Sequence, residues 1–513
     1  MRRRLLFGAC WPLLWISPGY AGAPDRQSAH DFVVEALRTL DYKNDVSAIK
    51  GFQFNLKFLK RDIVEGEHAG EPYIVTIGSA RETDDLETGY RLIETNDATN
   101  RGVIGRELTL GSADEFQNLQ DGKQVGGRLT LAPPAWEMRN PFLALRQAER
   151  AKELRSEPDE VLHGAPQRVV SFAADGVRIK VLLDANTHLI TATEALVGFS
   201  HATSSEIAYN AMGDVWERTE FMLWELSDGL RYPTQWDTYR DDMHLQTVTL
   251  DAGPTVTTWD PGLALGPESV RQAMRLAASN LNQIPLNSAI SGAPDPHRDI
   301  EEIASGVVQI PGSWYTTLVR QDDGIVVIDA PISSGYSAQV IREAQRRFPG
   351  VPIKAVITST AFFWHIAGVR EYASRHIPIY VLDANESTLK RVLNAPHKLV
   401  PDDFALHPQK PNIRVVHGRT ELGRGNNRII VMPIRLATEP MLMTYLPDAK
   451  LLHTGEMIQP LGPGGSLLHP ESLLEIRDSV VAEGLKVERL IGMHMSPIPW
   501  DDLESEVNKS QKE

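Results

Sequence analysis

Short runs in which apolar and polar residues alternate dominate the first half of the chain. One amphipathic helix is predicted at residues 28–40, and residues 49–131 form short alternating segments interrupted by Gly, Asn and Asp, as in antiparallel strands. A charged helix is predicted at residues 140–154, with Pro141 just inside its start. Further β-rich runs, separated by Asp-Gly and Asn-containing turns, follow this helix. We therefore predict a mostly antiparallel β domain with helices on one side over residues 24–285.

The pattern changes after residues 286–298, a stretch rich in Pro, Ala, Ser and Asp that is typical of a linker. Strands and helices then alternate, further strands follow, and a last long helix is predicted at residues 470–483. This order predicts an α+β domain over residues 299–505 and a tail over residues 506–513. No period of about 20–50 residues recurs in the sequence, which argues against a solenoid or a propeller.

Residues 1–23 have the pattern of a secretory signal peptide. Arginines occupy positions 2–4 and an apolar run covers positions 5–16. Small residues at positions 21–23 form the cleavage region, in which cleavage after Ala21 or after Ala23 fits the pattern. The alternative interpretation is a buried N-terminal helix. The only cysteine, Cys10, lies inside this segment, so a cleaved chain has no thiol for a disulfide or a metal. We expect an exported protein that is periplasmic or secreted.

The charge balance narrows the choice of partners. The chain has 52 Lys and Arg against 67 Asp and Glu, a formal net charge of −15. An acidic balance argues against a nucleic-acid partner, because the phosphate backbone binds basic surfaces. After the signal peptide no apolar stretch approaches the roughly 18 residues of a membrane span. We expect a small-molecule or peptide-like ligand, and the sequence does not define the oligomeric state.

Four sequence runs in the second half carry a family resemblance. They are IVVIDAP at residues 325–331, VITSTAFFWHIAG at 356–368, LPDAKLLHTGE at 446–456 and IGMH at 491–494. Together they resemble the motifs of the metallo-β-lactamase superfamily. The resemblance implies an αβ/βα sandwich in which metal ligands cluster where loops leave one edge of two facing sheets. The upstream β domain is similar, more weakly, to the front domain of exported members of this superfamily.

Most of the family's metal ligands are missing from this sequence. The His-x-His-x-Asp-His loop corresponds to Thr360 through His365, and only its last histidine is present. Phe362 and Trp364 stand in place of a histidine and of the carboxylate, and Ala437 aligns with a third histidine. Phenylalanine and alanine have no lone pair, so the two-metal centre of the family, with ions about 3.5–4 Å apart, is improbable here.

Three ligands of the second metal site remain. By alignment with the family they are His365, Glu456 in place of the bridging aspartate, and His494. Two imidazoles and a carboxylate form the set that holds single catalytic zinc ions, and the same set suits non-haem iron(II). Zinc lowers the pKa of a bound water to about 7 and polarises a carbonyl or phosphoryl oxygen. The sequence therefore predicts a hydrolase with one Zn or Fe ion.

The neighbours of these ligands suggest further roles. Thr358 or Thr360 is a candidate for orienting the attacking water beside Glu456, and Phe362 and Trp364 are candidates for the apolar wall of a substrate pocket. His453 and His417 lie near the same strands and are candidates for supporting the ligands.

The competing hypothesis is a metal-free pseudoenzyme that binds a ligand or partner in the former active-site pocket. In that case His365 is a hydrogen-bonded loop residue and His494 caps a strand. Two Ser-x-x-Lys matches, at Ser47 and Ser387, lack a companion Ser-Asp-Asn, so we interpret them as surface residues of helices. Aromatic residues of the front domain either line a groove or fill the core of a sheet, and burial preferences favour the core.

Overall fold

The structure is a computed structural model of the 513-residue chain. It describes residues 26–41, 43, 48–63, 70–86, 91–100, 103–111, 116–120, 123–128, 137–174, 177–198, 211–227, 229–257, 300–310, 314–434, 439–460, 467 and 470–510. The predicted signal peptide and the predicted linker lie outside these residues, so both stay predictions.

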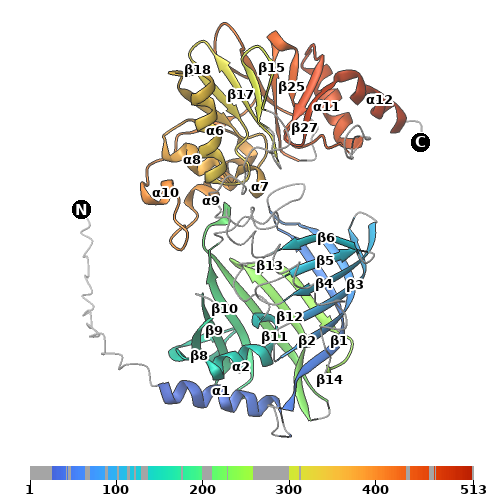
Figure 1. Ribbon diagram of the computed structural model, residues 1–513, viewed down its shortest axis with the longest axis vertical. Coiled ribbons are helices and arrows are strands. Elements are labelled where there is room, and N and C mark those ends of the chain that lie inside the picture. Colours follow the sequence, from blue (N-terminus) through green and yellow to red (C-terminus); the bar gives the residue numbers. More distant parts are fainter. Residues whose placement is uncertain are drawn as a thin grey trace, which may run out of the picture.

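The front half of the described chain forms one large antiparallel sheet (Figure 1). Along the sheet the strand order is β6-β5-β4-β3-β2-β1-β13-β12-β11-β10-β9-β8-β7, with β14 paired to the end of β1. Two meanders, β1–β6 and β7–β13, therefore join where β1 pairs with β13. The strands are β1 (Gly51–Asp62), β2 (Ile74–Asp85), β3 (Arg91–Asn100), β4 (Val103–Gly111), β5 (Phe116–Gln120), β6 (Lys123–Arg128), β7 (Arg155–Leu162), β8 (Ala165–Ala174), β9 (Val177–Asp184), β10 (Ile190–Val197), β11 (Val215–Ser227), β12 (Leu230–Arg240), β13 (Met243–Leu250) and β14 (Thr255–Thr257).

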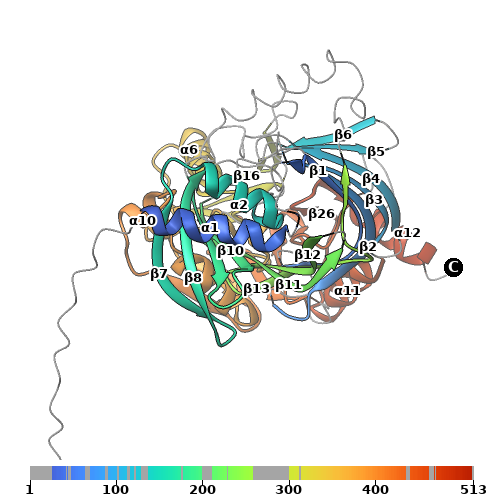
Figure 2. The same cartoon turned by 90° about the horizontal axis from the view of Figure 1, so that it is seen from below.

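Two helices pack against this curved sheet, α1 (Arg26–Leu40) and α2 (Pro141–Arg150) (Figure 2). Asn140 starts α2: its side-chain oxygen accepts the N–H groups of Phe142 and Leu143 at 3.0 and 3.2 Å. The ring of Phe142 packs edge-on against Phe52 of β1, with ring centroids 5.0 Å apart. The described residues of the front half thus form an antiparallel sheet with two helices packed on it, and the bounds of a separate front domain stay a prediction.

The aromatic residues of the front strands mostly fill the core, as burial preferences suggested. Tyr232 and Trp236 are buried, and the Tyr232 ring lies 5.4 Å from that of Phe52. Trp224 and Tyr239 are partly exposed, and Trp216 is 45% exposed.

The second half of the chain contains two smaller sheets. One has the order β15-β16-β17-β18-β19-β20-β21 and the other the order β22-β23-β24-β25-β26-β27. Their strands are β15 (Glu301–Ala304), β16 (Val307–Ile310), β17 (Thr316–Gln321), β18 (Gly324–Ile328), β19 (Ile353–Ile357), β20 (Ile379–Leu382), β21 (Ile413–Val416), β22 (Thr420–Leu422), β23 (Ile429–Pro433), β24 (Leu442–Leu446), β25 (Leu451–His453), β26 (Arg489–Gly492) and β27 (Met495–Pro499).

The two smaller sheets pack face to face, with helices outside. Val326 and Ile357 of the first sheet share one buried cluster with Leu451 and Ile491 of the second. The opposite face of the first sheet packs on α6 (Ser334–Arg347), α8 (Val369–Ser374) and α9 (Glu386–Asn394). The opposite face of the second sheet packs on α11 (Pro470–Ala482) and α12 (Trp500–Ser510). Central strands such as β18 are buried on both faces, which explains their uninterrupted apolar sequence.

The predicted tail over residues 506–513 is wrong in part. Helix α12 continues to Ser510, and Val507 is 1% exposed and packs in the same cluster as Leu503. These two residues are four positions apart and therefore lie on one face of the helix. The folded domain extends beyond residue 505 for this reason.

Residues 213–214 of the front half contact residues 396–399 of the second half, and we call this contact the joint. The Asp214 carboxylate accepts the N–H groups of Lys398 and Leu399 at 2.6 and 3.2 Å, and its own N–H donates to the Pro396 carbonyl at 2.6 Å. Gly213, with φ +78°, lies so close that a Cβ there would be 2.1 Å from the Pro396 oxygen. The joint therefore needs glycine at this position.

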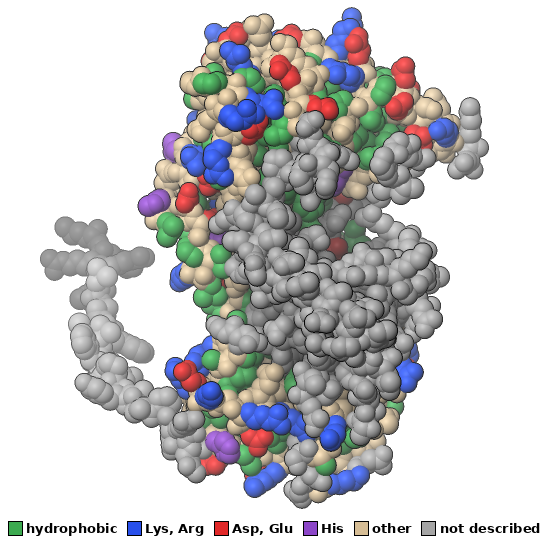
Figure 3. Space-filling view, viewed as in Figure 1, with side chains coloured by type: hydrophobic (Ala, Val, Ile, Leu, Met, Phe, Trp, Pro, Cys, Tyr) green, Lys and Arg blue, Asp and Glu red, His purple; other side chains and the backbone are tan. Residues whose placement is uncertain are grey.

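The surface of the described residues carries both charges. On the coloured parts of the face drawn in Figure 3, Lys and Arg side chains are interspersed with Asp and Glu. Among the described helices, none is both long enough and apolar enough to cross a bilayer.

We predict that Gly213→Ala destabilises the chain more than Gly350→Ala. Both glycines have φ +78°, but a Cβ at Gly350 meets no atom within 4 Å, whereas one at Gly213 meets the Pro396 carbonyl. Overpacking of this kind costs about 1–3 kcal/mol. Denaturant unfolding of the two variants measures the difference, and equal losses of stability would show that the joint does not constrain the fold.

Candidate metal centre

The three predicted ligands follow strands of both smaller sheets. His365 lies in the short helix α7 (Phe363–Ile366), which comes after β19 of the first sheet. Glu456 follows β25 and His494 follows β26, which are parallel neighbours in the second sheet. Because the sheets face each other, the loops after these strands meet at one edge.

The ligand atoms of His365, Glu456 and His494 all lie within 4.8 Å of one another. The shortest of these separations is 2.5 Å, from His365 Nδ1 to Glu456 Oε2. The two imidazole rings are 5.5 Å apart between centroids, at 76° to each other. Within the described residues this is the one group of three such side chains close enough to hold a metal ion. The predicted convergence is therefore present, and the binding of a metal stays a prediction.

Two buried atoms of this group fit a bound cation. Glu456 Oε1 and His494 Nε2 are buried and have no hydrogen-bond partner among the described residues. Buried polar atoms of folded proteins are nearly always paired, so this pair of atoms requires an explanation. A divalent cation that accepts nitrogen and oxygen ligands would pair both of them.

Burial shifts the titration of the group in the metal-free protein. It raises the pKa of Glu456 to about 8, although a hydrogen bond from Thr360 acts in the opposite direction. It lowers the pKa of His494 to about 3, with a further contribution from His365. At neutral pH Glu456 therefore holds a proton and His494 is a neutral imidazole with a lone pair available. Metal binding must displace the Glu456 proton, so affinity should rise with pH.

The two candidate hydroxyls lie in different surroundings. Thr360 bonds to the carboxyl of Glu456, and its Oγ1 also accepts the N–H of Phe362 at 3.2 Å. Thr358 Oγ1 instead donates to the Tyr380 carbonyl at 3.1 Å. Thr360 is therefore the hydroxyl beside the ligands, while Thr358 bonds to the neighbouring strand β20.

Aromatic rings surround His365. Its ring lies 6.4 Å from Phe362 and 5.7 Å from Trp314, and Trp314 lies 5.5 Å from Trp364. Phe362 is buried, whereas Trp364 and Trp314 are partly exposed. Trp314 was not predicted, because a single tryptophan in a loop carries no spacing signal.

A second pair of polar residues lies behind the ligands. Asp329, directly after β18, is fully buried, and its Oδ2 lies 3.6 Å from Nε2 of the equally buried His453. His453 was a candidate for supporting the ligands, but Asp329 had no predicted role. His417, the other candidate, is exposed and bonds to Asp383 at 3.0 Å, at the surface. Ala437 lies outside the described residues.

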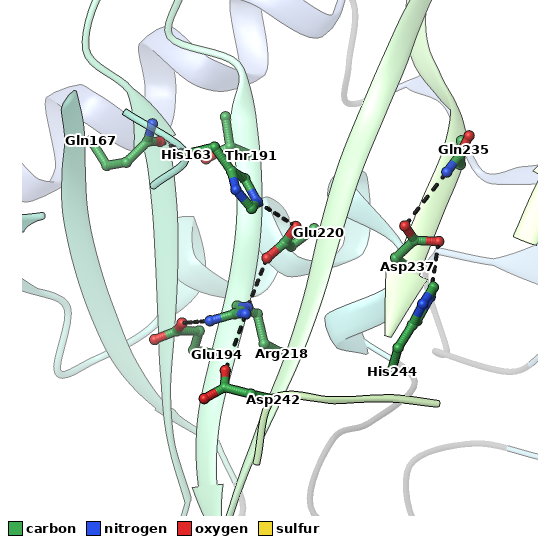
Figure 4. Close-up of polar contacts among 10 residues, drawn as sticks. All are labelled: His163, Gln167, Thr191, Glu194, Arg218, Glu220, Gln235, Asp237, Asp242 and His244. Carbon is green, nitrogen blue, oxygen red and sulfur yellow. Dashed lines mark hydrogen bonds and ion pairs between the residues drawn. The ribbon is translucent and has the colours of Figure 1, made fainter. Parts of the chain in front are cut away.

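A cluster of polar and charged side chains also lies on the front sheet (Figure 4). Arg218 Nε lies 2.8 Å from Glu220, whose other oxygen lies 2.8 Å from His163 Nε2. Arg218 also lies 3.6 Å from Glu194, and His244 lies 3.4 Å from Asp237. Each of these side chains has an ion-pair partner within the cluster, and we interpret it as part of the sheet and not as a site. On α9, Lys390 of one Ser-x-x-Lys match pairs with Glu386 at 2.7 Å and is exposed, as expected for a helix surface.

Comparison of the sequence with protein-family models and with curated proteins finds no match. Solved structures do resemble the chain. The metallo-β-lactamase TMB-1 is 16% identical over 42% of this chain and 99% of its own, with a TM-score of 0.32. A metallo-β-lactamase from Pontibacter korlensis is 14% identical over the same shares, with a TM-score of 0.33.

A third similar structure is the inverting sec-alkylsulfatase Pisa1 from Pseudomonas sp., which is 14% identical over 50% of this chain, with a TM-score of 0.32. The match spans 44% of that enzyme, less than half of its length. The first two of these structures are metallo-β-lactamases by name. The chain is a mixed α/β protein with large antiparallel sheets, as predicted.

We predict that the metal-free protein loses stability as the pH rises from 6.5 to 8. Burial raises the pKa of Asp329 from 3.8 to about 7, and Glu456 is raised from 4.5 to about 8. In this window the folded chain binds more protons than the unfolded chain, so the free energy of unfolding falls with pH, by about 2 kcal/mol in total.

His453 and His494 act weakly in the opposite direction, because their pKa is about 3 in the folded chain against 6.5 in the unfolded chain, so most of their contribution falls below pH 6.5. Urea unfolding in the presence of a chelator measures the slope, and Glu456→Gln should remove most of it. A stability that is flat or rising from pH 6.5 to 8 would contradict the assigned protonation states.

Proposed function

We propose that the chain is an exported hydrolase of metallo-β-lactamase fold, with one metal ion held by His365, Glu456 and His494. The observation that carries the proposal is the convergence of these three side chains, with two buried ligand atoms that have no other partner among the described residues. The αβ/βα sandwich formed by the two smaller sheets is, in this proposal, the catalytic domain, and the large antiparallel sheet is a front domain.

The remaining ligand set favours one ion and not two. In the family's other metal site, two of the ligand positions correspond to Thr360 and Phe362 of this chain. The Thr360 hydroxyl bonds to Glu456 and to the Phe362 N–H, and Phe362 has no lone pair. Both side chains therefore close the space where further donors would be needed.

Zinc or iron bound here would acidify a water molecule and polarise the bond to be hydrolysed. The chain's own residues have separate tasks. His365 and His494 supply neutral nitrogens, and Glu456 supplies an oxygen whose orientation the Thr360 hydroxyl holds. Phe362 and Trp364 exclude water from the His365 side and form the wall against which a substrate rests.

A metal-free binding protein is the second candidate, and one contact favours it. His365 Nδ1 and Glu456 Oε2 already meet at 2.5 Å, so a proton shared between them stabilises the pocket without a cation. In that case the pocket binds a small ligand between the aromatic rings, and Glu456 Oε1, which has no hydrogen-bond partner among the described residues, accepts a hydrogen bond from it.

Metal content separates the two candidates. We expect about one zinc or iron ion per purified chain, and we expect His365→Ala and His494→Ala to lose it. His417→Ala is the matched control, because His417 is a surface histidine bonded to Asp383. Elemental analysis gives the stoichiometry, and a melting temperature that rises with added zinc gives an independent readout. No metal in the wild type, with a melting temperature that zinc does not move, would support the metal-free candidate.

A further prediction concerns the position next to His365. Trp364→Asp should raise the zinc affinity, because it restores a carboxylate where the family has one and adds a ligand to the three present. Trp364→Asn, which is of similar size but uncharged, is the control and should raise the affinity less. Competition titration against a chromophoric chelator measures both. An unchanged affinity in the aspartate variant would mean that the loop is aligned wrongly.

A further inference from the structure

Two fully buried polar side chains lie behind the ligands, one from each smaller sheet. Asp329 follows β18 and His453 ends β25, and both have 0% exposure. Asp329 Oδ2 and His453 Nε2 are 3.6 Å apart, which is longer than a hydrogen bond but close for two polar groups away from water. Burying such groups costs free energy unless they bond to other groups, so their remaining bonds are informative.

Asp329 bonds to the loop that leads to His365. Its Oδ1 accepts the backbone N–H of Ser359 at 2.7 Å, and its own N–H donates to the Ile357 carbonyl at 2.8 Å. Its backbone has φ +68°, a conformation that residues other than glycine rarely adopt. The structure therefore holds Asp329 in an unfavourable backbone conformation that places its carboxyl on the ligand loop.

His453 bonds to the segment that carries Glu456. Its Nδ1 accepts the N–H of Gly455 at 3.1 Å, which assigns the proton of the neutral ring to Nε2, the nitrogen that faces Asp329. The Gly455 carbonyl in turn accepts the N–H of Met493 at 2.8 Å. Gly455 precedes Glu456 and Met493 precedes His494. Hydrogen bonds therefore connect the His453 imidazole to the backbone next to both ligands.

The three segments that carry His365, Glu456 and His494 approach one another so closely that there is no room for a side chain at the glycines between them. Gly455 has φ +66°, and a Cβ there would lie 2.9 Å from Ser359 Oγ. A Cβ at Gly492 would lie 2.8 Å from the Gly455 carbonyl oxygen. No side chain separates the segments at these points, so the Asp329 and His453 bonds add to the sheet packing and the backbone bonds that hold the segments together.

We propose that Asp329 and His453 are positioning residues that hold Glu456 and the loop of His365 in the geometry that one metal ion requires. The inference rests on the proposed function, since it concerns the same ion. Neither residue touches the ion: Asp329 acts through Ser359, and His453 acts through Gly455. Groups that orient metal ligands in this way typically change metal affinity by about 10–100-fold when they are removed.

The decisive variant is His453→Phe. Phenylalanine fills the space of the imidazole without an acceptor for the Gly455 N–H, and it replaces a buried polar group by an apolar one. The lost acceptor lowers the stability of the metal-free protein and the removal of a buried polar ring raises it, so we expect an unfolding temperature within a few degrees of wild type, while zinc affinity falls about tenfold or more. Competition titration measures the affinity, and the visible spectrum of the cobalt-loaded protein reports the changed ligand geometry.

Two conservative variants and one control complete the test. Asparagine carries an acceptor near the place of Nδ1, so His453→Asn should keep the zinc affinity within a few-fold of wild type. Glutamine carries a donor near the place of Nε2 but loses that acceptor. The zinc affinity of His453→Gln should therefore lie between those of the phenylalanine and asparagine variants. His397→Phe changes another buried histidine, which lies at the joint beside Gly213, and should leave zinc affinity unchanged.

The outcomes are distinct. A His453→Phe variant that binds zinc as tightly as wild type overturns the inference and leaves the proposed function intact. Equal losses of affinity and of metal-free stability in the phenylalanine and asparagine variants also overturn it, because they indicate a packing role. A wild type that takes up no zinc refutes the proposed function itself, and the positioning role with it.

Discussion

The packing of two apolar sheet faces is the interaction on which the candidate site depends. Val326 and Ile357 on one sheet meet Leu451 and Ile491 on the other, and these contacts fix the distance between the loops that follow the strands. His365 comes from one sheet, and Glu456 and His494 come from the other. A shift of one residue in any of these strands would exchange its buried and outward faces, so the register that forms the core also sets the site.

Several polar side chains are buried at the site, next to the packed sheet faces. Asp329, His453 and Glu456 are all within 6% of complete burial, and the described residues around them supply few hydrogen bonds. Such groups lower the stability of a metal-free chain, because they are separated from water without full compensation. In the proposal, the bound ion supplies the missing partner of Glu456.

The sequence predicted those parts of the fold that local patterns encode. The apolar runs at 325–328 and 353–357 are central strands, and the amphipathic run before residue 348 is helix α6. The ligands were found because family motifs place them next to such strands. Helix α12 was missed, since only Leu503 and Val507 indicate an apolar face in a charged segment. The approach of Asp329 to His453 and of Trp314 to His365 joins residues far apart in the chain, and no local pattern contains it.

The central claim is that one cation lies between His365, Glu456 and His494. Anomalous diffraction from crystals of the zinc-loaded protein, recorded above and below the zinc absorption edge, tests it most directly. The account predicts a single strong peak in contact with all three side chains and no second peak beside Thr360 or Phe362. Two peaks in the pocket, a peak bound to other residues, or no peak at saturating zinc would contradict it.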